Sequence, residues 1–316
     1  MIYEMIRRVS PKEYGNLFPE PSHVFDSVAF NELNREKCDG IHYLVMSDAG
    51  GKVRFGLILG ERGDELRSPF SAPFGGLEAR GRSQRVGHYI DAIKDVMDYG
   101  RSLGRRIVIT LPPAVYDNKS SVMASQLQAA LSCGATVGHS DYNYHYPLDS
   151  FGSFVSDLDI KVRQKFLASD RQGFEFEHHA IHEHEAVEEI YSIILANHTA
   201  LGYPVRMSLD DIRRTSTCVP MDFFMLRKEG RGVAGAMVYH TSPDVAQLIY
   251  WGDMLEYRAL RPMNYFAYRI LEYYHRQGKR AFDLGPSSSD GIPSLGLCDF
   301  KAGLGCVLTP KFTLIL

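Results

Sequence analysis

Apolar side chains recur at three- and four-residue steps in two stretches of the chain, the spacing of one face of an α-helix. The first face precedes Gly104 and consists of Val86, Ile90, Ile93 and Met97. The second lies between Pro262 and Gly278 and consists of Met263, Phe266, Ala267, Ile270, Leu271 and Tyr274. Proline suits the first turn of a helix and glycine commonly ends one, so the pattern predicts a helix in each stretch.

Short apolar or β-branched runs bounded by glycine predict strands around both helices. "GKVRFGLILG" and "RGVAGAMVYH" occupy the same place before their helices, and "GRRIVITLPP" and "GKRAFDLGPS" the same place after them. Each half therefore reads as strand, glycine-rich turn, strand, loop, strand, helix and strand. This order predicts an internal duplication of one β–β–β–α–β module, with a coincidence between two α/β segments as the alternative.

Further helices are expected between these segments. They are predicted around 120–132, over the basic stretch "IKVRQKFLASDRQG" and along the apolar stripe from Val187 to His198. Ser208 followed by Asp211 resembles a capping box that opens a short helix. "YPLDSFGSF" breaks a strand near Ser150, and no low-complexity linker follows it. We expect domains at 1–150 and 151–316, packed as one body with a cleft between them.

Composition narrows the class of protein. The 316 residues are 45% hydrophobic and 23% charged, as in a soluble globular protein, and the net charge of -3 argues against a surface that coats nucleic acid. An odd, scattered set of cysteines without metal-ligand spacing predicts reduced thiols: Cys38, Cys133, Cys218, Cys298 and Cys306. The N-terminal stretch lacks the apolar core of a signal peptide, and no apolar run approaches the roughly 18 residues that span a bilayer. We expect a cytoplasmic protein.

The stretch "FDLGPSSSDGIPSLGLCDFKAGLGC" runs from Phe282 to Cys306 and places one lysine after an aromatic residue, with glycines on both sides. Gly296, Gly303 and Gly305 would let a backbone approach a ligand closely. The pattern predicts a loop that carries Phe300 and Lys301. Lys301 is then either a solvated loop charge or a cation that the loop brings to a reaction centre.

Several motifs, in order, resemble the Fem-type proteins, which carry two GNAT-fold modules in one chain. These motifs are "SPFSAPFGG", "LDIKVRQKFLASDRQGFEFE", "ANHTALGYPVRMSLDDI", "RPMNYFAYRILEYYHRQGKRAFDLG" and "DFKAGLG". The resemblance covers most of the chain from about Phe70. It implies an α/β (α+β) fold of tandem modules, each a mixed, mostly antiparallel sheet flanked by helices. It also implies transfer of an acyl or aminoacyl group to an amine.

The chain departs from the usual acetyl-CoA loop of this fold, a glycine-rich turn whose N–H groups hold pyrophosphate at a helix start. In the second module the turn is "LRPMNY", where Pro262 removes one N–H group and no glycine is present. The first module has "ARGRSQRVGHY", so Arg82, Arg85 and Gly87 are the expected phosphate-binding residues; a solvated basic loop is the alternative. Acyl-CoA is the favoured cosubstrate. No paired-helix arm is evident, so tRNA is the less favoured partner.

The resemblance places the active centre where the fourth and fifth strands of a module diverge. "AQLIYWGDM" and "RAFDLG" would supply those strands. Acyl transfer needs a neutral amine, a stabilised oxyanion and a proton for the leaving group. We expect backbone N–H groups from Tyr250 to Gly252 to bind the oxyanion, Tyr250 to donate the proton, and Asp253 or Asp283 to accept the amine proton. The alternatives are a core tyrosine, a loop charge at Asp253 and a turn cap at Asp283.

The resemblance also gives Lys301 a role, because the Phe-Lys pair lies in the cleft of Fem-type proteins. There Lys301 would neutralise phosphate or polarise the acyl carbonyl, with Phe300 packed beside it. Trp251, which is otherwise a core aromatic residue, and the glycines of "PFGG", Gly75 and Gly76, would line the substrate site. A plain turn is the alternative for the glycines.

Recognition of donor or acceptor is assigned to a second set of residues: Arg163, Tyr203, Arg206 and Asn264. Arginine forms paired hydrogen bonds with carboxylates and phosphates, which suits nucleotide-linked sugars, peptide ends or CoA. Each arginine could instead be an ordinary surface residue. Asn264 stands near a helix start and could simply cap it.

Other chemistries find little support. The run "EHHAIHEHE" lacks the HExxH spacing and a nearby cysteine, so we expect a polar strand end running into a helix start and no metal site. There is no GxSxG elbow, Walker loop or Rossmann fingerprint. The sequence thus predicts an N-acyltransferase that acts by direct attack on a small-molecule or nucleotide-linked amine, such as an envelope or capsule precursor. An aminoacyl-tRNA-dependent peptidoglycan aminoacyltransferase and a non-catalytic binding protein of the same fold are the alternatives.

Overall fold

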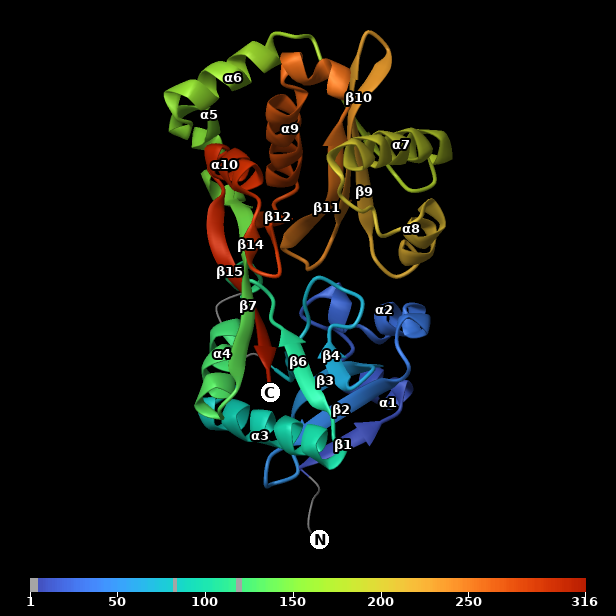
Figure 1. Ribbon diagram of the computed structural model, residues 1–316, viewed down its shortest axis with the longest axis vertical. Helices are drawn as coiled ribbons and strands as arrows, with labels where there is room; N and C mark the ends of the chain where they lie inside the picture. Colours follow the sequence, from blue (N-terminus) through green and yellow to red (C-terminus); the bar gives the residue numbers. More distant parts are fainter. Residues whose placement is uncertain (1–4, 82–83, 118–120) are drawn as a thin grey trace. The chain divides into compact units, whose positions relative to one another are not determined.

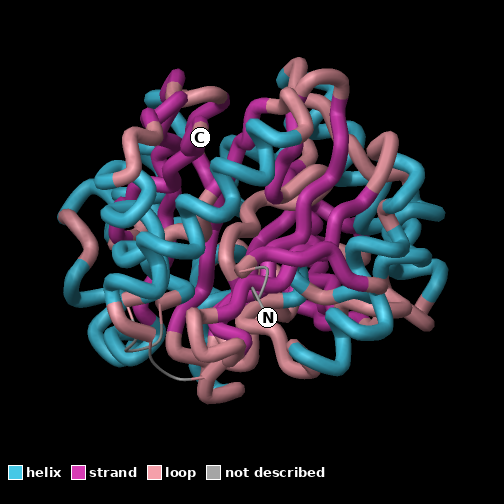
Figure 2. The backbone as a smooth tube through the Cα atoms, turned by 90° about the horizontal axis from the view of Figure 1, so that it is seen from below, coloured by secondary structure: helices cyan, strands magenta, loops and turns pink. Residues whose placement is uncertain are grey.

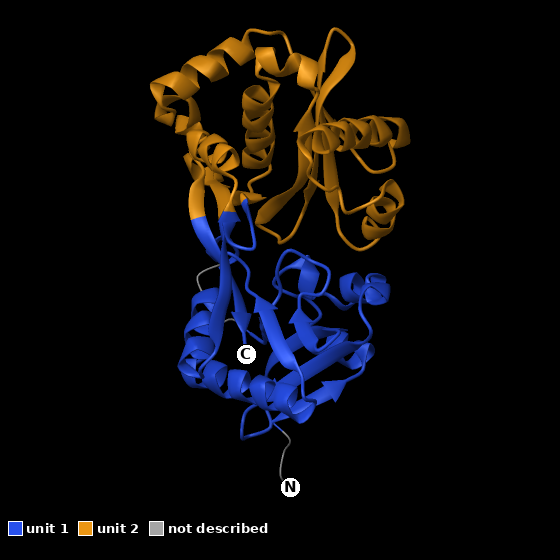
Figure 3. Ribbon diagram, in the orientation of Figure 1, with its two compact units in different colours: residues 1–142, 288–292, 309–316 blue, residues 143–287, 293–308 orange. Residues whose placement is uncertain are grey.

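The computed structural model describes residues 5–81, 84–117 and 121–316 of the chain (Figure 1). Two compact units divide it, drawn in blue and orange in Figure 3. Unit 1 holds residues 1–142, 288–292 and 309–316, and unit 2 holds residues 143–287 and 293–308. The boundary after Tyr142 therefore cuts strand β7 (Thr136–Pro147), and the last strand, β15 (Val307–Ile315), also contributes residues to both units. Unit 1 thus includes segments from the C-terminal part of the chain.

Unit 1 follows the predicted order of elements. It contains β1 (Ile6–Val9), α1 (Pro11–Leu17), α2 (Val28–Leu33), β2 (Ile41–Ser47), β3 (Val53–Arg62), β4 (Glu65–Ser68), β5 (Glu78–Ala79), α3 (Val86–Ser102), β6 (Arg106–Thr110) and α4 (Val122–Ser132). The strand order is β1-β2-β3-β4-β6-β15-β7, with β5 beside β3. β4 and β6 pair in parallel, whereas β1 to β4 pair antiparallel and so do β6 and β15.

The two faces of this sheet carry separate cores, because successive strand residues point to opposite sides. Leu44 and Met46 of β2 pack with α3 and α4 in one cluster. Tyr43 and Val45 of the same strand pack with Tyr14 of α1 in another. Helices therefore cover both faces.

Unit 2 repeats this order with more helices before it. It contains η4 (Leu148–Ser153), α5 (Phe154–Asp157), α6 (Ile160–Asp170), β8 (Glu175–His179), α7 (His184–Leu201), α8 (Leu209–Thr215), β9 (Met221–Lys228), β10 (Arg231–Tyr239), β11 (Val245–Asp253), η5 (Leu255–Leu260), α9 (Pro262–Arg276), β12 (Ala281–Pro286) and α10 (Leu295–Gly303). The strand order is β7-β12-β11-β10-β9-β8, and only β11 and β12 are parallel among the paired strands described here. β13 (Ser288–Ser289), which belongs to unit 1, and β14 (Ile292–Pro293), which contributes one residue to each unit, form a separate ribbon.

Two long helices flank the sheet of unit 2 on opposite faces. Ala234 and Ala236 of β10 join the core cluster that includes Phe266 and Ile270 of α9. Gly235, between them, faces α7, where an added Cβ would lie 3.0 Å from the Ile190 carbonyl oxygen. The glycine therefore permits close packing of α7 on the strand. Figure 2 shows the helices of the chain in cyan and its strands in magenta.

The predicted helices are confirmed over 86–102, 122–132, 160–170, 184–201 and 262–276, and Ser208 and Asp211 form the predicted capping box. The loop predicted around Phe300 and Lys301 is wrong, because these residues lie in helix α10. Cys298, Lys301 and Leu304 are all buried at three-residue steps, so one side of the segment packs inward. The glycines hid this periodicity. None of the helices in the described part of the chain has both the length and the apolarity required to cross a membrane.

Candidate active site

Strands β11 and β12 of unit 2 lie side by side at their beginnings and then separate (Figure 1). They pair in parallel from Val245 opposite Ala281 to Gln247 opposite Asp283. Beyond this point β11 continues to Asp253 along β10, whereas β12 continues along β7. Among the described residues, the backbone groups of β11 that face β12 beyond Gln247 therefore have no strand partner on that side. The divergence that the sequence analysis expected between these two strands is present.

A β-bulge lies at the point of divergence. Met237 of β10 stands opposite Tyr250, but the next residue, Val238, stands opposite Leu248, so Ile249 is an extra residue in β11. A bulge redirects the following side chains and locally interrupts the ladder. Tyr250 follows the bulge directly, within the part of β11 that no longer pairs with β12.

The Tyr250 hydroxyl is held by the loop that follows α7. It accepts a hydrogen bond of 3.1 Å from the backbone N–H of Arg206. Burial raises the pKa of the Tyr250 phenol, so the group keeps its proton at neutral pH. The side chains of Tyr203 and Arg206 in the same loop are exposed. Three predicted site residues therefore gather at this point.

Two residues of α7 contact β11 just after the bulge, and the sequence analysis missed both as site residues. The His198 Nε2 atom lies 3.2 Å from the Trp251 carbonyl oxygen, and the His198 ring meets the Tyr250 ring edge-on at 5.6 Å. Because a carbonyl only accepts, Nε2 carries the hydrogen and Nδ1 has the lone pair; Nδ1 is buried without a hydrogen-bond partner among the described residues. Burial lowers the pKa of His198, which favours this neutral ring. Asn197 also approaches closely, since a Cβ at Gly252 would lie 2.6 Å from its Cβ.

The position of His198 could not be read from the sequence. It falls at the end of the helical stripe that begins at Val187, where its spacing is that of a core residue. Only the packing of α7 on β11 shows that His198 contacts this strand.

Trp251 and Phe300 connect β11 with α10. Their rings meet at an interplanar angle of 63° with centroids 5.8 Å apart. Both are half-buried and pack against the core on the α9 side of the sheet. Because Tyr250 faces α7 and Trp251 faces α9, the divergent end of β11 offers a polar side chain on one face and an aromatic wall on the other.

Lys301 lies beneath the end of β12. Its Nζ donates hydrogen bonds to the carbonyl oxygens of Leu284 and Gly285, each at 2.8 Å, and of Pro286 at 3.1 Å. An ammonium has three N–H donors, so these carbonyls occupy all of them. Its exposure is 2%, and burial lowers the pKa of Lys301 to about 8 although nearby Asp283 acts in the opposite direction. The solvated loop charge, one of the two alternatives for Lys301, is therefore wrong, and a role of this cation at a reaction centre stays a prediction.

Asp283 is the centre of a buried hydrogen-bond network. Its carboxyl oxygens accept hydrogen bonds from the side chains of Asn143 at 2.8 Å and Gln247 at 3.0 Å, and from the Gly285 N–H at 2.9 Å. The bond to Gly285 has the form of the turn cap that was the alternative for this residue. Asp283 has no exposed surface, so it acts on β12 from within the sheet.

Asp253 closes the other end of the site. Asn197 Nδ2 donates to its backbone oxygen at 2.7 Å and to Oδ1 at 2.8 Å, and Arg258 forms an ion pair with it at 3.3 Å. The carboxyl group is buried. These contacts fix the turn between β11 and η5.

Helix α9 begins without a side-chain cap. Arg261 precedes it in the left-handed region with φ 58°, and Pro262 occupies the first turn. The Asn264 N–H bonds to the Arg261 carbonyl at 3.2 Å. Few backbone donors therefore remain at this end, in agreement with the departure noted in "LRPMNY".

Gly75 and Gly76 belong to unit 1 and are buried there. The Gly75 N–H bonds to the Thr110 carbonyl at 2.9 Å, and the Gly76 N–H to Ser68 Oγ at 3.1 Å. Added Cβ atoms would lie 2.7 Å from Ser68 Oγ and 2.8 Å from Gln126 Oε1 respectively. Both glycines thus serve a tight closure beyond β4 and β6.

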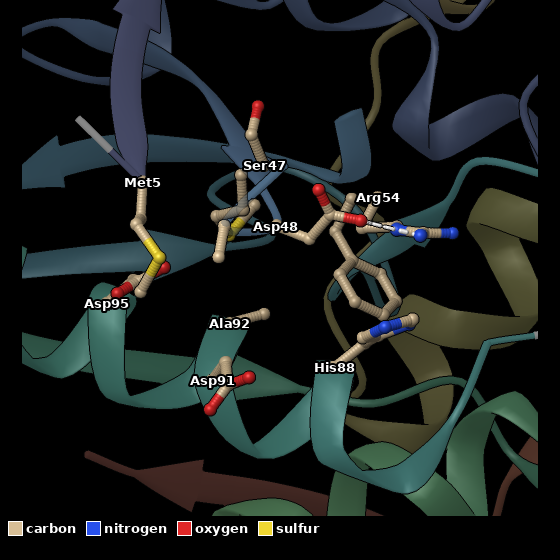
Figure 4. A pocket seen from close by; sticks show the side chains of 11 residues that line it. Met5, Ser47, Asp48, Arg54, His88, Asp91, Ala92 and Asp95 are labelled. Carbon is tan, nitrogen blue, oxygen red and sulfur yellow. Dashed lines mark hydrogen bonds and ion pairs between the residues drawn. The ribbon is translucent and has the colours of Figure 1, made fainter. Parts of the chain in front are cut away.

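The expected phosphate-binding residues also belong to unit 1. Arg82 lies outside the described residues, and Arg85 and Gly87 are exposed at the start of α3. A hollow of about 150 Å³ beside the first turns of α3 is lined by His88, Asp91 and Asp95, and by Asp48 paired with Arg54 (Figure 4). Burial and the neighbouring carboxylates raise the pKa of Asp95 to about 6. Three of the lining side chains are acids and Arg54 is already paired with Asp48, so the hollow is poorly suited to a phosphate. Phosphate binding by Arg85 and Gly87 stays a prediction.

Arg163 lies on α6, apart from the residues around Tyr250. Its Nη2 donates to the Leu158 carbonyl at 3.0 Å and to the Ser156 carbonyl. It lines a cavity with residues of η4, α5 and α9, none of which belongs to β11 or β12.

The histidine-rich run has the expected form, with β8 ending at His179 and α7 beginning at His184. His178 Nε2 and His240 Nε2 lie 2.7 Å and 2.6 Å from the two oxygens of Asp222, which also accepts from Tyr274. Burial acts to raise the pKa of Asp222, but these hydrogen bonds outweigh it and hold the pKa well below its usual value. Within the described ranges, no group of three or more histidine, cysteine or acidic residues has a metal-binding arrangement.

Comparisons with known proteins bear on the fold. No protein-family model and no curated protein matches the chain. Solved structures match over nearly its whole length. FemX is 11% identical, with a TM-score of 0.66 over 98% of this chain and 96% of its own. The L-PGS of Bacillus licheniformis is also 11% identical, with a TM-score of 0.58 over 98% and 92%.

A third matching structure is that of a tandem GNAT protein. The tandem GNAT protein from the clavulanic acid biosynthesis pathway is 13% identical, with a TM-score of 0.51 over 88% of this chain and 82% of its own. At these identities the likeness concerns the fold alone. Together with the repeated order of elements and the divergent strands of unit 2, it shows that this chain has the Fem-type, tandem GNAT-like fold.

Proposed function

We propose that the protein is an N-acyltransferase whose reaction takes place in unit 2, at the divergence of β11 and β12. One observation carries the proposal: the two strands part after Gln247 and Asp283, and the bulge at Ile249 sets Tyr250 beside the unpaired backbone. An acyl donor can accept hydrogen bonds from such a backbone as a strand would. The donor is an acyl-CoA, and the amine attacks it directly.

The chemistry follows from this placement. The amine nitrogen attacks the thioester carbonyl and forms a C–N bond, and N–H groups of the Tyr250–Gly252 segment stabilise the oxyanion. The C–S bond then breaks, and Tyr250 gives its proton to the leaving sulfur. The amine proton returns to the phenolate, directly or through water, so the tyrosine ends as it began. Because Asp283 has no exposed surface and Asp253 is paired with Arg258, the proposal assigns neither carboxyl group to this transfer.

His198 is a positioning residue in this scheme. Its hydrogen bond to the Trp251 carbonyl fixes the bulge on which the oxyanion donors stand. Lys301 holds the end of β12 through three carbonyls, which sets the other edge of the opening. Trp251 and Phe300 supply an apolar wall for the acyl group.

We assign different residues to the binding of the acyl donor and of the acceptor amine. The tandem GNAT structure is described as being without AcCoA, which makes acyl-CoA the first donor to test. Exposed Arg261 at the start of α9 is the residue we assign to its phosphates, since Pro262 reduces the backbone donors there. On the α7 face, Tyr203 and Arg206 suit a small amine that carries a carboxylate, a phosphate or a nucleotide.

The experiment measures thiol release from acetyl-CoA and longer acyl-CoAs with a panel of amino sugars, nucleotide-linked amino sugars and amino acids. Acyl-CoA is expected to raise the melting temperature by binding the folded protein, and one amine class is expected to release thiol. Arg206→Gln should raise KM for an anionic amine and leave kcat unchanged, whereas Arg231→Gln, at the exposed first residue of β10 in the same unit, should change neither.

Two outcomes contradict the proposal. Transfer from alanyl-tRNA, with no reaction of any acyl-CoA, would support the aminoacyl-tRNA-dependent alternative. A stabilising ligand without turnover from either donor would identify a binding protein, for which Pro262 in place of a glycine turn is the best support.

A further inference from the structure

A cavity of about 480 Å³ lies in unit 2 and shares no lining residue with the β11–β12 divergence. Its wall comes from four segments: η4, α5, the first half of α6, and the middle of α9. The volume falls within the range of pockets that hold small organic ligands, roughly 300–1,000 Å³. The cavity is therefore large enough to be a binding site of its own.

Aromatic rings form one side of the cavity. Tyr268 lies 5.3 Å from both Phe151 and Phe154, measured between ring centroids. Phe151 and Phe154 are buried and belong to the core cluster of unit 2. Since core packing fixes these rings, the apolar wall exists before any ligand arrives.

Arg163 supplies a positive charge at the same cavity. Its Nη2 bonds to the carbonyls of Ser156 and Leu158, and its Nε is buried without a hydrogen-bond partner among the described residues. No carboxylate in the described part of the chain lies within ion-pairing distance of it. Asp157, at the end of α5, bonds instead to the hydroxyls of Ser153 and Ser156. The guanidinium charge is thus offset by carbonyl dipoles only.

A half-buried guanidinium beside an aromatic wall suits a ligand that has both an anionic group and a flat apolar part. We propose that this cavity binds a small organic anion, in which a carboxylate, sulfonate or phosphate meets Arg163 and a flat apolar body packs on Phe151, Phe154 and Tyr268. Arginine is suited to such heads because its donors form charge-assisted hydrogen bonds in a fixed fork. This site is independent of the proposed acyl transfer.

The test uses a matched pair of fluorescent probes. 1-Anilino-8-naphthalenesulfonate combines a naphthyl body with an anionic head, and N-phenyl-1-naphthylamine has the same body without the charge. Arg163→Gln should weaken binding of the sulfonate by about tenfold or more and leave the neutral probe nearly unchanged. Lys161→Gln removes the same charge from an exposed position on α6 that does not line the cavity, and should change neither.

Gly152→Leu tests the cavity itself. Gly152 lines it, and an added Cβ would meet nothing within 4 Å, so a larger side chain fills the space without disturbing the core. This variant should weaken both probes by about tenfold or more, with a melting temperature close to that of the wild type. Arg163→Lys keeps the charge and should restore part of the sulfonate affinity.

Melting temperatures decide whether a variant is usable. If Arg163→Gln unfolds, Gly152→Leu still carries the test. Sulfonate binding that resists Gly152→Leu, or that falls equally for Arg163→Gln and Lys161→Gln, would overturn the proposal. A structure with the probe bound elsewhere would do the same.

Discussion

The two units differ in how the strand before the main helix pairs with the strand after it. In unit 1, β4 pairs with β6 along its whole length, from Glu65 opposite Arg106 to Ser68 opposite Ile109. The following loop then seals the space beyond, where Gly75 bonds to Thr110. In unit 2, β11 and β12 pair over three residue pairs and then part. One module is closed at this point, and the other is open.

A second comparison concerns the helix after the last core strand of each module. In unit 1, Gln126 of α4 accepts from the Leu77 N–H at 2.8 Å and donates to the Leu77 carbonyl at 3.1 Å. In unit 2, Lys301 of α10 donates to three carbonyls at the end of β12. Both side chains are 2% exposed. An amide that both donates and accepts can close a loop over the sheet, whereas an ammonium that only donates can hold a strand end.

The difference teaches that two modules with the same order of elements need not share the same opening. In unit 1, the loop of residues 69–79 closes the end of the sheet. Gly76, at φ 119°, allows the turn. Unit 2 has no such insertion between β11 and α9, where η5 follows instead. The open module is therefore the one in which chemistry is expected.

The largest effect is expected from Tyr250→Phe, which removes one oxygen at the open position. Loss of a general acid typically costs roughly 100- to 10,000-fold in turnover. Thiol release by the variant should fall by that factor, while the melting temperature stays close to that of the wild type because the ring keeps its packing. The measurement is kcat for the best acyl-CoA and amine pair.

The matched control lies at the sealed position of unit 1. Tyr116 packs its ring 4.6 Å from Phe74 of the closing loop. Tyr116→Phe should leave turnover within about twofold of the wild type. Equal losses in the two variants would mean that the open module has no special role.

The sequence predicts the modules well because their signals are local. Periodicity alone locates α3 and α9, and glycine-bounded runs locate the strands around them. The chemistry of a strand end, by contrast, depends on long-range packing. No local pattern shows that Lys301 donates hydrogen bonds to the carbonyls of Leu284, Gly285 and Pro286. Nor does one show that His198 bonds to the Trp251 carbonyl. The closure at Gly75 also needs contacts that "PFGG" does not reveal.

Lys301→Met separates two roles of the lysine. If Lys301 positions β12, the variant leaves three carbonyls without their donor and should lose roughly 3 to 4 kcal/mol of stability in unit 2. Hydrogen exchange should rise in peptides covering β12 and α10, and turnover should fall in step with the fraction folded. If Lys301 instead polarises the acyl carbonyl, exchange should stay unchanged while turnover falls.

Gln126→Leu is the corresponding change in unit 1. It leaves the Leu77 N–H and carbonyl buried without partners, at a cost of roughly 2 to 3 kcal/mol. Exchange should rise around residues 69–79 and α4, and kcat at a temperature where the variant is folded should match the wild type. A fall in kcat without greater exchange would show that the sealed module takes part in the reaction.

The smallest effect concerns acids buried in the sealed module. Glu78 of β5 accepts from the Ser22 N–H at 3.0 Å and the Ser22 hydroxyl at 2.9 Å, and burial raises the pKa of Glu78 to about 7. Burial, with Glu78 as a second cause, also raises the pKa of nearby Asp26. A proton bound more tightly in the folded than in the unfolded state stabilises the fold at low pH. The contribution of Glu78 is therefore complete below about pH 4.5 and lost as the pH rises to about 7.

This linkage predicts that unit 1 loses roughly 2 kcal/mol of stability between about pH 5 and pH 8 through Glu78. Glu78→Gln, which is neutral at every pH, should flatten that part of the dependence, and the remaining slope reports Asp26 and the other carboxyls. Hydrogen exchange of peptides from β3 and β5, corrected for the intrinsic rate at each pH, measures it for unit 1 alone. Peptides from β9 and β10 serve as the internal reference, since unit 2 does not contain Glu78. A wild-type slope that survives Glu78→Gln unchanged would mean that this carboxyl is already ionised in the folded protein, and that the sealed module is less dry than its packing indicates.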